Sequence, residues 1–243
     1  MPITAHSHVR FLPTRWSLIL AANAQTPGAR RALDDLLRIY WFPLYAYLRR
    51  RGHAPDQAED LTQGFLADLL ARSDLAALSP AKGKFRSFLL AALTHFVSNQ
   101  RDHARAQKRG GTHALFSLHA PPDAESRYAL EPVDTLTPER LFERRWALAL
   151  LDQVLATLRA RYAAAGQSAL FDTLSPLLTG ELTQPYAQLA PTLGLTEPAL
   201  KVAAHRLRKR YRDTLRAHIA ATLPEPASPA QIEEEITHLL NCL

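Results

Sequence analysis

The sequence predicts an all-α protein with two small helical domains joined by a flexible linker, the second domain containing a helix-turn-helix. Composition is the first indication: Ala, Leu and Arg are abundant, β-branched runs are scarce, and 243 residues include only 9 glycines. Periodicity is the second, because apolar residues recur at i, i+3 and i+4 along most of the chain. Residues 110–136 lack this period and contain Gly, Pro, Ser and Asp, so they are the predicted linker.

Three helices are predicted in the first domain, residues 14–109. In the first helix, Pro43 predicts a kink or an interruption, since proline has no backbone N–H to donate. In the third helix, Phe85 and Phe88 fall on the apolar stripe and are expected in the core. The predicted helices cover residues 30–50, 54–72 and 85–109.

The second domain, residues 137–220, is predicted to begin with a long helix. Thr137 is its expected N-cap, and Pro138 suits its first turn. A shorter helix over 170–178 is expected to end near Gly180. The remaining residues, 221–243, form an acidic C-terminal extension with an amphipathic pattern.

The stretch that begins at Tyr186, YAQLAPTLGLTEPALKVAAHRL, predicts the helix-turn-helix. Ala190 is small where two helices cross closely, Gly194 is free to adopt positive φ in the turn, and Thr196 is suited to cap the second helix. The expected apolar seam is Leu189, Leu193, Leu195, Leu200 and Ala203. Such a helix commonly enters the major groove of DNA. The residues expected to contact DNA are Thr196, Glu197, Ala199, Lys201, Val202, His205, Arg206, Lys209 and Arg210.

Positive charge is concentrated in two places. Residues 201–216 contain seven Lys or Arg and one Asp, so this stretch alone carries +6, the net charge of the whole chain. A second basic group consists of Arg101, Arg105, Lys108 and Arg109. Two separated basic patches favour a long polyanion as partner over a merely solvated helix face.

No arrangement of residues predicts a catalytic site, a metal site or a cofactor. The histidines are dispersed, and His6 and His8 stand alone near the N-terminus. KGK and KRGG lack the spacing and the preceding strand of a phosphate-binding loop. A helical nuclease that uses His95, His103 and nearby acids is the enzyme alternative, and metal-dependent cleavage of DNA without a promoter would support it.

A cytoplasmic location is expected. Cys242 is the only cysteine, which excludes an internal disulfide and suits a reducing compartment. The apolar core of WSLILAANA, residues 16–24, is short for a secretory signal. No run of about 18 apolar residues predicts a membrane span.

Over residues 14–220 the chain resembles bacterial sigma factors of the extracytoplasmic-function (ECF) group, in the sigma-70 family. YWFPLYAYLRRRGHAPDQAEDLTQGFLADLL is similar to the region-two helices that dock on the β′ clamp of core RNA polymerase. FRSFLLAALTHFVSNQRDHARAQKR resembles the helix that opens and reads the minus-ten promoter element. Residues 138–216 are similar to region four, whose helix-turn-helix reads the minus-thirty-five element and touches the β flap.

The resemblance implies a function and partners. It implies promoter recognition and melting, with double- and single-stranded promoter DNA and core RNA polymerase as partners, and an anti-sigma factor or a regulatory kinase as further ones. Clamp binding would fall to the acidic and amide side chains of the second helix, Asp56, Glu59, Asp60, Gln63 and Asp68. Minus-ten contacts would fall to Lys84, Arg86, His95, Asn99, Arg101, His103 and Arg105.

The sequence leaves two questions open, one about the function and one about the C-terminal extension. The chain is either such a sigma factor or a helix-turn-helix regulator that acts without polymerase docking, and only the acidic helix over 54–72 favours the former. The acidic extension, which carries −4 over residues 224–243, either folds back on a basic surface and restrains DNA binding or packs as an extra helix. In the second case its packing residues are Ile232, Ile236 and Leu239.

Overall fold

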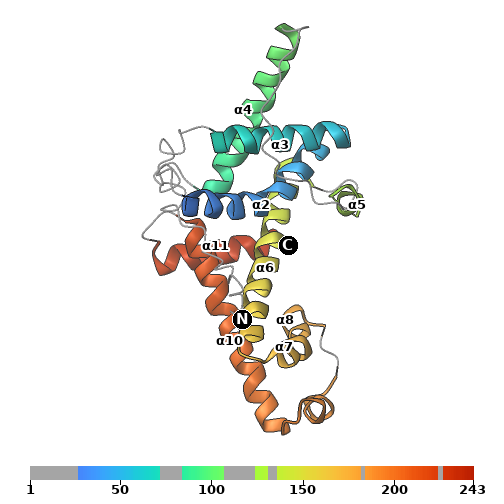
Figure 1. Cartoon of the computed structure of the whole chain (residues 1–243), viewed down its shortest axis with the longest axis vertical. Helices are drawn as coiled ribbons and strands as arrows, with labels where there is room; N and C mark the ends of the chain where they lie inside the picture. The colour runs from blue at the N-terminus through green and yellow to red at the C-terminus, as the bar shows by residue number, and fades with distance from the viewer. Residues whose placement is uncertain (1–26, 72–83, 107–123, 131–135, 182–183, 224–226) are drawn as a thin grey trace, which may run out of the picture. The chain divides into compact units, whose positions relative to one another are not determined.

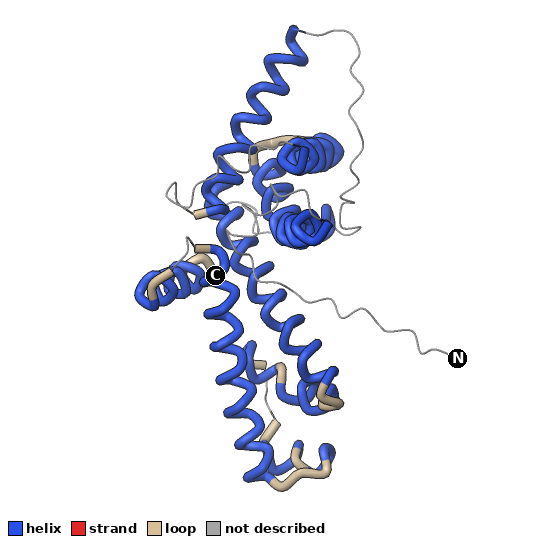
Figure 2. Tube along the Cα trace, turned by 60° about the vertical axis from the view of Figure 1, so that its left-hand side comes forward, coloured by secondary structure: helices blue, strands red, loops and turns tan. Residues whose placement is uncertain are grey.

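The computed structural model describes residues 27–71, 84–106, 124–130, 136–181, 184–223 and 227–243, and only the backbone at 27–38, 70–71 and 101–106. Within these ranges the regular elements are all helical and no strand occurs, as predicted (Figure 1; Figure 2). In chain order they are α2 (Pro27–Arg50), α3 (Pro55–Ala71), α4 (Phe85–Ala106), α5 (Ala124–Ala129), α6 (Pro138–Ala164), α7 (Ser168–Leu174), α8 (Pro176–Thr179), α9 (Tyr186–Leu189), the 3₁₀ turn η3 (Pro191–Leu193), α10 (Glu197–Thr222) and α11 (Pro229–Asn241).

The chain divides into two compact units. The larger unit combines Thr14–Asp152 with Ile219–Leu243, and the smaller unit includes Gln153–His218, of which the structure describes all but residues 182–183. The boundaries therefore fall inside α6 and α10 rather than at the start of the second predicted domain. The first half of α6 and the C-terminal extension both belong to the larger unit.

The centre of α2 is the core of the larger unit. Residues 40–48 are all buried, on every side of the helix, as expected for a helix surrounded by others. Tyr40 meets the edge of Phe85 on α4, with ring centroids 5.5 Å apart. The indole Nε1 of Trp146 on α6 donates to the Tyr40 hydroxyl at 3.1 Å. Phe85 is thus a core residue, as predicted.

α2 continues through Pro43, so of the two effects predicted for this proline, a kink or an interruption, the interruption does not occur. A proline inside a helix costs about 3 kcal/mol, through the lost hydrogen bond and a clash with the preceding turn. Burial of each large apolar side chain contributes roughly 1.5–3 kcal/mol, and Trp41, Leu44 and Leu48 are all buried beside this position. Burial of these apolar side chains therefore outweighs the cost of a proline inside the helix.

Part of the predicted linker is helical and packed. α5 lies within residues 110–136, and its Glu125 accepts hydrogen bonds from Arg49 and from the Tyr45 hydroxyl on α2. Tyr128 packs its ring edge against Tyr45, with centroids 6.5 Å apart. Residues 124–129 of the predicted flexible linker therefore form a helix, because polar and aromatic contacts stabilise a segment too short to form a helix alone.

In the smaller unit, the helix predicted over 170–178 is two helices. α7 ends at Leu174 and α8 begins at Pro176, whose ring supplies no N–H to continue the first helix. α8 ends at Gly180 with φ of +79°, as predicted for a glycine C-cap. Tyr162 on α6 packs against Phe171 on α7, with centroids 5.5 Å apart, so this pair forms part of the unit's core.

The C-terminal extension forms α11, which begins with a capping box between Ser228 and Gln231. Leu239 is fully buried, as the packing alternative requires, while Ile232 and Ile236 are half-buried. Glu235 is also buried, at 1% exposure, which the sequence did not predict. Packing of the extension as an extra helix is therefore confirmed.

Among the helices of the described residues, none is both long enough and apolar enough to cross a lipid bilayer.

Candidate nucleic-acid interface

In residues 185–222, the short helix α9 and the 3₁₀ turn η3 are followed by the long helix α10. α9 leads through the buried Ala190 into η3. Gly194 follows with φ of +64°, in the left-handed region, and the Leu195 N–H donates back to the Ala190 carbonyl at 3.0 Å. A glycine turns the chain sharply here at little cost, so that α10 starts close behind η3.

Thr196 precedes α10 and caps it. Its hydroxyl accepts from the N–H of Ala199 at 3.4 Å, and its carbonyl accepts from the N–H of Leu200 at 3.0 Å. Glu197 suits the positive end of the helix dipole and pairs with Lys201 at 2.6 Å. An exposed pair of this kind contributes at most about 1 kcal/mol, so the cap and the burial of Leu200 fix the first turn.

The inner side of α10 has the spacing of an amphipathic helix. Leu200, Ala204 and Leu207 follow one another at four and three residues, and each is at most 1% exposed. Leu195 is a correction to the predicted seam, because it lies in the turn before the helix and is 37% exposed. The other predicted seam residues are buried or half-buried: Leu189, Leu193, Leu200 and Ala203.

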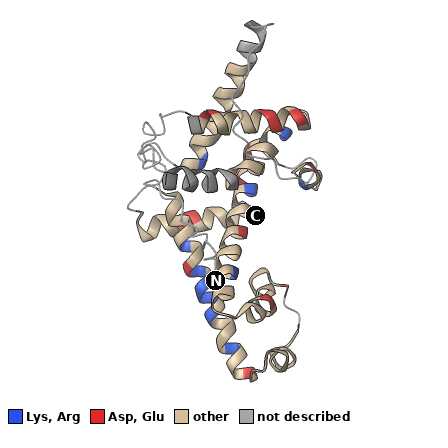
Figure 3. Cartoon of the chain, in the orientation of Figure 1, with Lys and Arg blue, Asp and Glu red and all other residues tan. Residues whose placement is uncertain are grey.

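The outer side of α10 and its N-cap present the predicted DNA-contacting residues to solvent. All are exposed except the half-buried Glu197: Thr196, Ala199, Lys201, Val202, His205, Arg206, Lys209 and Arg210. Figure 3 shows the positive charge along this helix. Val202 is 49% exposed and places an apolar group among the cations. Cations of this kind can contact phosphates, and an apolar side chain can meet a thymine methyl group.

Arg210 also has a contact inside the smaller unit. Its guanidinium carbon lies 5.2 Å from the ring centroid of Tyr162, which is 3% exposed. A cation–π contact at an exposed site contributes about 0.5–1 kcal/mol. This contact orients Arg210 without covering it, since the residue as a whole remains exposed.

The predicted clamp-binding residues lie on α3, but not all on one side of it. Asp56, Glu59, Asp60 and Gln63 recur at three and four residues and share a face, where the Gln63 amide donates to Glu59 at 2.9 Å. At 100° per residue, Asp68 falls on a different side of the helix. Asp56 and Asp60 are exposed and the other three are half-buried.

The predicted minus-ten residues are distributed over the length of α4. His95 and Asn99 are exposed and lie one turn apart. Lys84, just before the helix, is half-buried. The backbone of α4 extends to Ala106, while the side chains of Arg101, His103 and Arg105 lie outside the described residues.

Arg86 does not lie on the surface, which corrects its inclusion among the DNA-contacting residues. Its side chain is 3% exposed. Its Nε donates to Glu143 on α6 at 2.7 Å, and its Nη1 donates to Glu235 on α11. The guanidinium carbon also lies 4.3 Å from the ring centroid of Trp146. Buried charges require such partners, so the charge of Arg86 is used inside the larger unit.

Glu235 completes this buried ion-pair group with Lys84, whose Nζ lies 2.6 Å from Glu235 Oε2. Burial on its own raises the pKa of Glu235. Hydrogen bonds and positive charge from Lys84 and Arg86 outweigh that effect, so the pKa of this carboxyl lies below its usual value. Glu235 is therefore held as a carboxylate.

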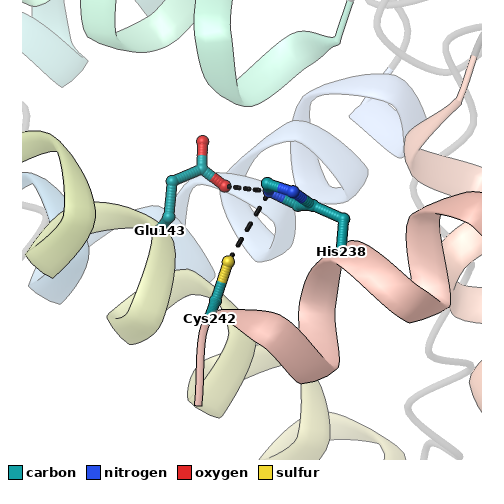
Figure 4. Close-up of side chains that lie close together, drawn as sticks. All are labelled: Glu143, His238 and Cys242. Atoms are coloured by element: carbon teal, nitrogen blue, oxygen red, sulfur yellow. Dashed lines mark hydrogen bonds and ion pairs between the residues drawn. The ribbon is translucent and has the colours of Figure 1, made fainter.

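A further polar cluster, absent from the sequence-based prediction, joins α6 to α11. Figure 4 shows Glu143, His238 and Cys242 pointing toward one another. His238 Nε2 lies 3.1 Å from Glu143 Oε2 and 3.6 Å from Cys242 Sγ. His238 and Cys242 are four residues apart, a spacing that places both on one face of a helix. Glu143 is 95 residues from His238, so spacing alone could not identify it.

Comparison of the chain with protein-family models, with curated proteins and with solved structures gives no match.

Proposed function

We propose that this chain is a sigma factor of the extracytoplasmic-function type, which binds core RNA polymerase and directs initiation at specific promoters. The observation that carries the DNA-binding part of the proposal is the outer face of α10, while the acidic side chains of α3 favour a polymerase partner. Directly after the sharp turn at Gly194, a capped helix exposes Lys201, Arg206 and Lys209 to solvent. This is the arrangement that a recognition helix needs to lie in the major groove.

The helix-turn-helix in this proposal consists of α9 with η3, the turn at Gly194, and α10. Leu189 and Ala190 are buried, and so is Leu200 in the first turns of α10, as close packing of the two helical parts requires. In the proposed complex, the cations contact phosphates and set the register. Val202 and His205 lie on the same exposed face and are the residues that read bases.

Docking on the polymerase falls to α3 in this proposal. Asp56, Glu59, Asp60 and Gln63 offer a row of carboxylates and one amide, which suits a basic partner helix in the β′ clamp. Asp68, on another side of α3, is left out of this row. Contacts with the melted minus-ten element fall to His95 and Asn99, with Arg101, His103 and Arg105 further along α4.

The alternative, a DNA-binding regulator that acts alone, shares α10 but has no use for the acidic row on α3. Transcription with purified core RNA polymerase and a library of genomic DNA fragments separates the two. A sigma factor associates stably with the core enzyme and produces transcripts from discrete start sites. DNA binding without any association with the core enzyme would favour the regulator instead.

Variants of α3 make the docking surface testable. We expect Asp60→Ala combined with Gln63→Ala to weaken association with core polymerase about tenfold or more, while binding of free DNA through α10 is unchanged. Gln57→Ala is the matched control, since Gln57 is exposed on the same helix and stands outside the row. Equal affinity of the double variant and the control for the core enzyme would exclude this docking surface.

A further inference from the structure

We propose that Glu143, His238 and Cys242 form a binding site for a divalent cation of the zinc class, which fastens α11 to α6. The site goes beyond the proposed function and does not depend on it. It lies within the larger unit, where α6 supplies the carboxylate, the last turn of α11 supplies the imidazole, and the residue that follows α11 supplies the thiol.

The geometry supports this site because the three ligand atoms converge. One oxygen of Glu143, a ring nitrogen of His238 and the sulfur of Cys242 all lie within 4.8 Å of one another. Zinc bond lengths of 2.0–2.3 Å correspond to ligand atoms roughly 3.3–3.6 Å apart in a tetrahedron. The distances from His238 Nε2 to the other two atoms, 3.1 and 3.6 Å, are close to this range.

The donor set selects the type of metal. One oxygen, one nitrogen and one sulfur suit Zn²⁺ and similar transition metals, whereas Ca²⁺ and Mg²⁺ prefer oxygen alone. The side chains of Glu143 and His238 are 24% and 40% exposed, and Cys242 is half-buried. Solvent can therefore provide a fourth ligand, as in zinc sites with three protein ligands.

Neighbouring charged groups orient one ligand of the metal, and some of them also repel the metal. Arg86 donates to Glu143 and thereby orients a ligating carboxylate, a role that surrounding hydrogen bonds commonly play at metal sites. Its positive charge and that of Lys84 disfavour a cation, but Glu235 pairs with both. Burial and the nearby carboxylates raise the pKa of the Cys242 thiol, although Arg86 and Lys84 act against them. Zinc binds cysteine as the thiolate, so this proton must leave when the metal binds.

Cobalt(II) titration of the reduced full-length chain tests the site, because a thiolate ligand gives a charge-transfer band. We expect one equivalent of cobalt to produce this band together with the intense visible bands of four-coordinate cobalt, and zinc to abolish both. Cys242→Ser should remove the charge-transfer band. His238→Gln and Glu143→Gln should each weaken binding about tenfold or more.

Two controls keep the result interpretable. Glu234→Gln removes an exposed carboxylate from the same helix and should leave the titration unchanged. Zinc should also raise the thermal unfolding midpoint of the wild-type chain but not of Cys242→Ser, whose helix content is checked by circular dichroism. Weak octahedral bands without the sulfur band, as His6 and His8 would give, or equal binding by the wild type and Cys242→Ser, would overturn the proposal.

Discussion

At the scale of single residues, the buried charges of the larger unit depend on one another. Arg86 and Glu235 have side chains only 3% and 1% exposed, so either would be costly to bury without its partner. Glu143 provides Arg86 with a second carboxylate, and Lys84 provides Glu235 with a second cation. Loss of Arg86 therefore leaves Glu235 paired with Lys84, and loss of Glu235 leaves Arg86 paired with Glu143.

Glu235→Gln is expected to destabilise the larger unit by about 2–3 kcal/mol, because the amide keeps the shape but removes the charge that Arg86 and Lys84 face. Urea unfolding followed by tryptophan fluorescence measures this, since Trp41 and Trp146 both lie in this core. Glu234→Gln, one position away and exposed, should change stability by no more than about 0.5 kcal/mol. A similar small effect of both substitutions would contradict the role assigned to Glu235.

The same variant should alter the pH dependence of stability. Because folding lowers the pKa of Glu235, its carboxylate stabilises the fold above its usual pKa of 4.5, and this contribution is lost as pH falls through the lowered folded-state pKa. Wild-type stability should therefore fall more steeply than that of Glu235→Gln below about pH 4.5. Parallel curves for the two proteins would show that Glu235 is not held as a carboxylate.

Single residues also show where sequence reasoning succeeds and fails. Phe85 could be assigned to the core because its apolar neighbours recur with helical period. Arg86, the next residue, is predicted to contact the minus-ten element because it is a cation in the stretch that resembles the promoter-melting helix. Its burial depends on Glu143 and Glu235, which are 57 and 149 residues away in the sequence. No local pattern contains that information.

At the scale of elements, the helices were predictable where their boundaries have local causes. Pro55 opens α3 and Gly180 ends α8, as expected from proline and glycine preferences. α5 was not predictable, because six residues cannot form a stable helix alone and its contacts come from α2. Nor could the burial of Pro43 be foreseen, since α2 is surrounded by helices from distant parts of the chain.

The packing of α11 gives a prediction that compares two adjacent leucines. Leu239 is fully buried while Leu240 is 58% exposed. Leu239→Ala should therefore cost about 2–5 kcal/mol in the larger unit's free energy of unfolding, through lost burial and a cavity. Leu240→Ala should cost no more than about 0.5 kcal/mol. Urea unfolding of both variants measures the difference, and equal effects would mean that α11 does not pack in this register.

At the scale of the whole molecule, positive and negative charges are concentrated on different elements. The chain's net charge of +6 equals the charge of residues 201–216 alone, so the rest of the chain sums to zero. Within that remainder, α3 concentrates acidic groups on one exposed face, and Glu235 in the acidic extension neutralises cations inside the larger unit. The positions of charged residues in the sequence identify the basic run. They do not show that part of the extension's negative charge is buried inside the larger unit.

If α10 binds DNA through its exposed cations, affinity must depend strongly on salt, since each phosphate contact releases a counterion. We expect Arg206→Gln combined with Lys209→Gln to weaken binding to promoter and unrelated DNA alike. The slope of log affinity against log salt should fall by about 2, roughly one for each lost contact. Arg159→Gln is the matched control, because Arg159 is an exposed cation of the same unit that pairs with Asp172 and lies on α6. Fluorescence anisotropy at several salt concentrations measures all three proteins. An unchanged slope in the double variant would mean that the outer face of α10 does not contact the phosphate backbone, and the charge on this helix would then require a different partner.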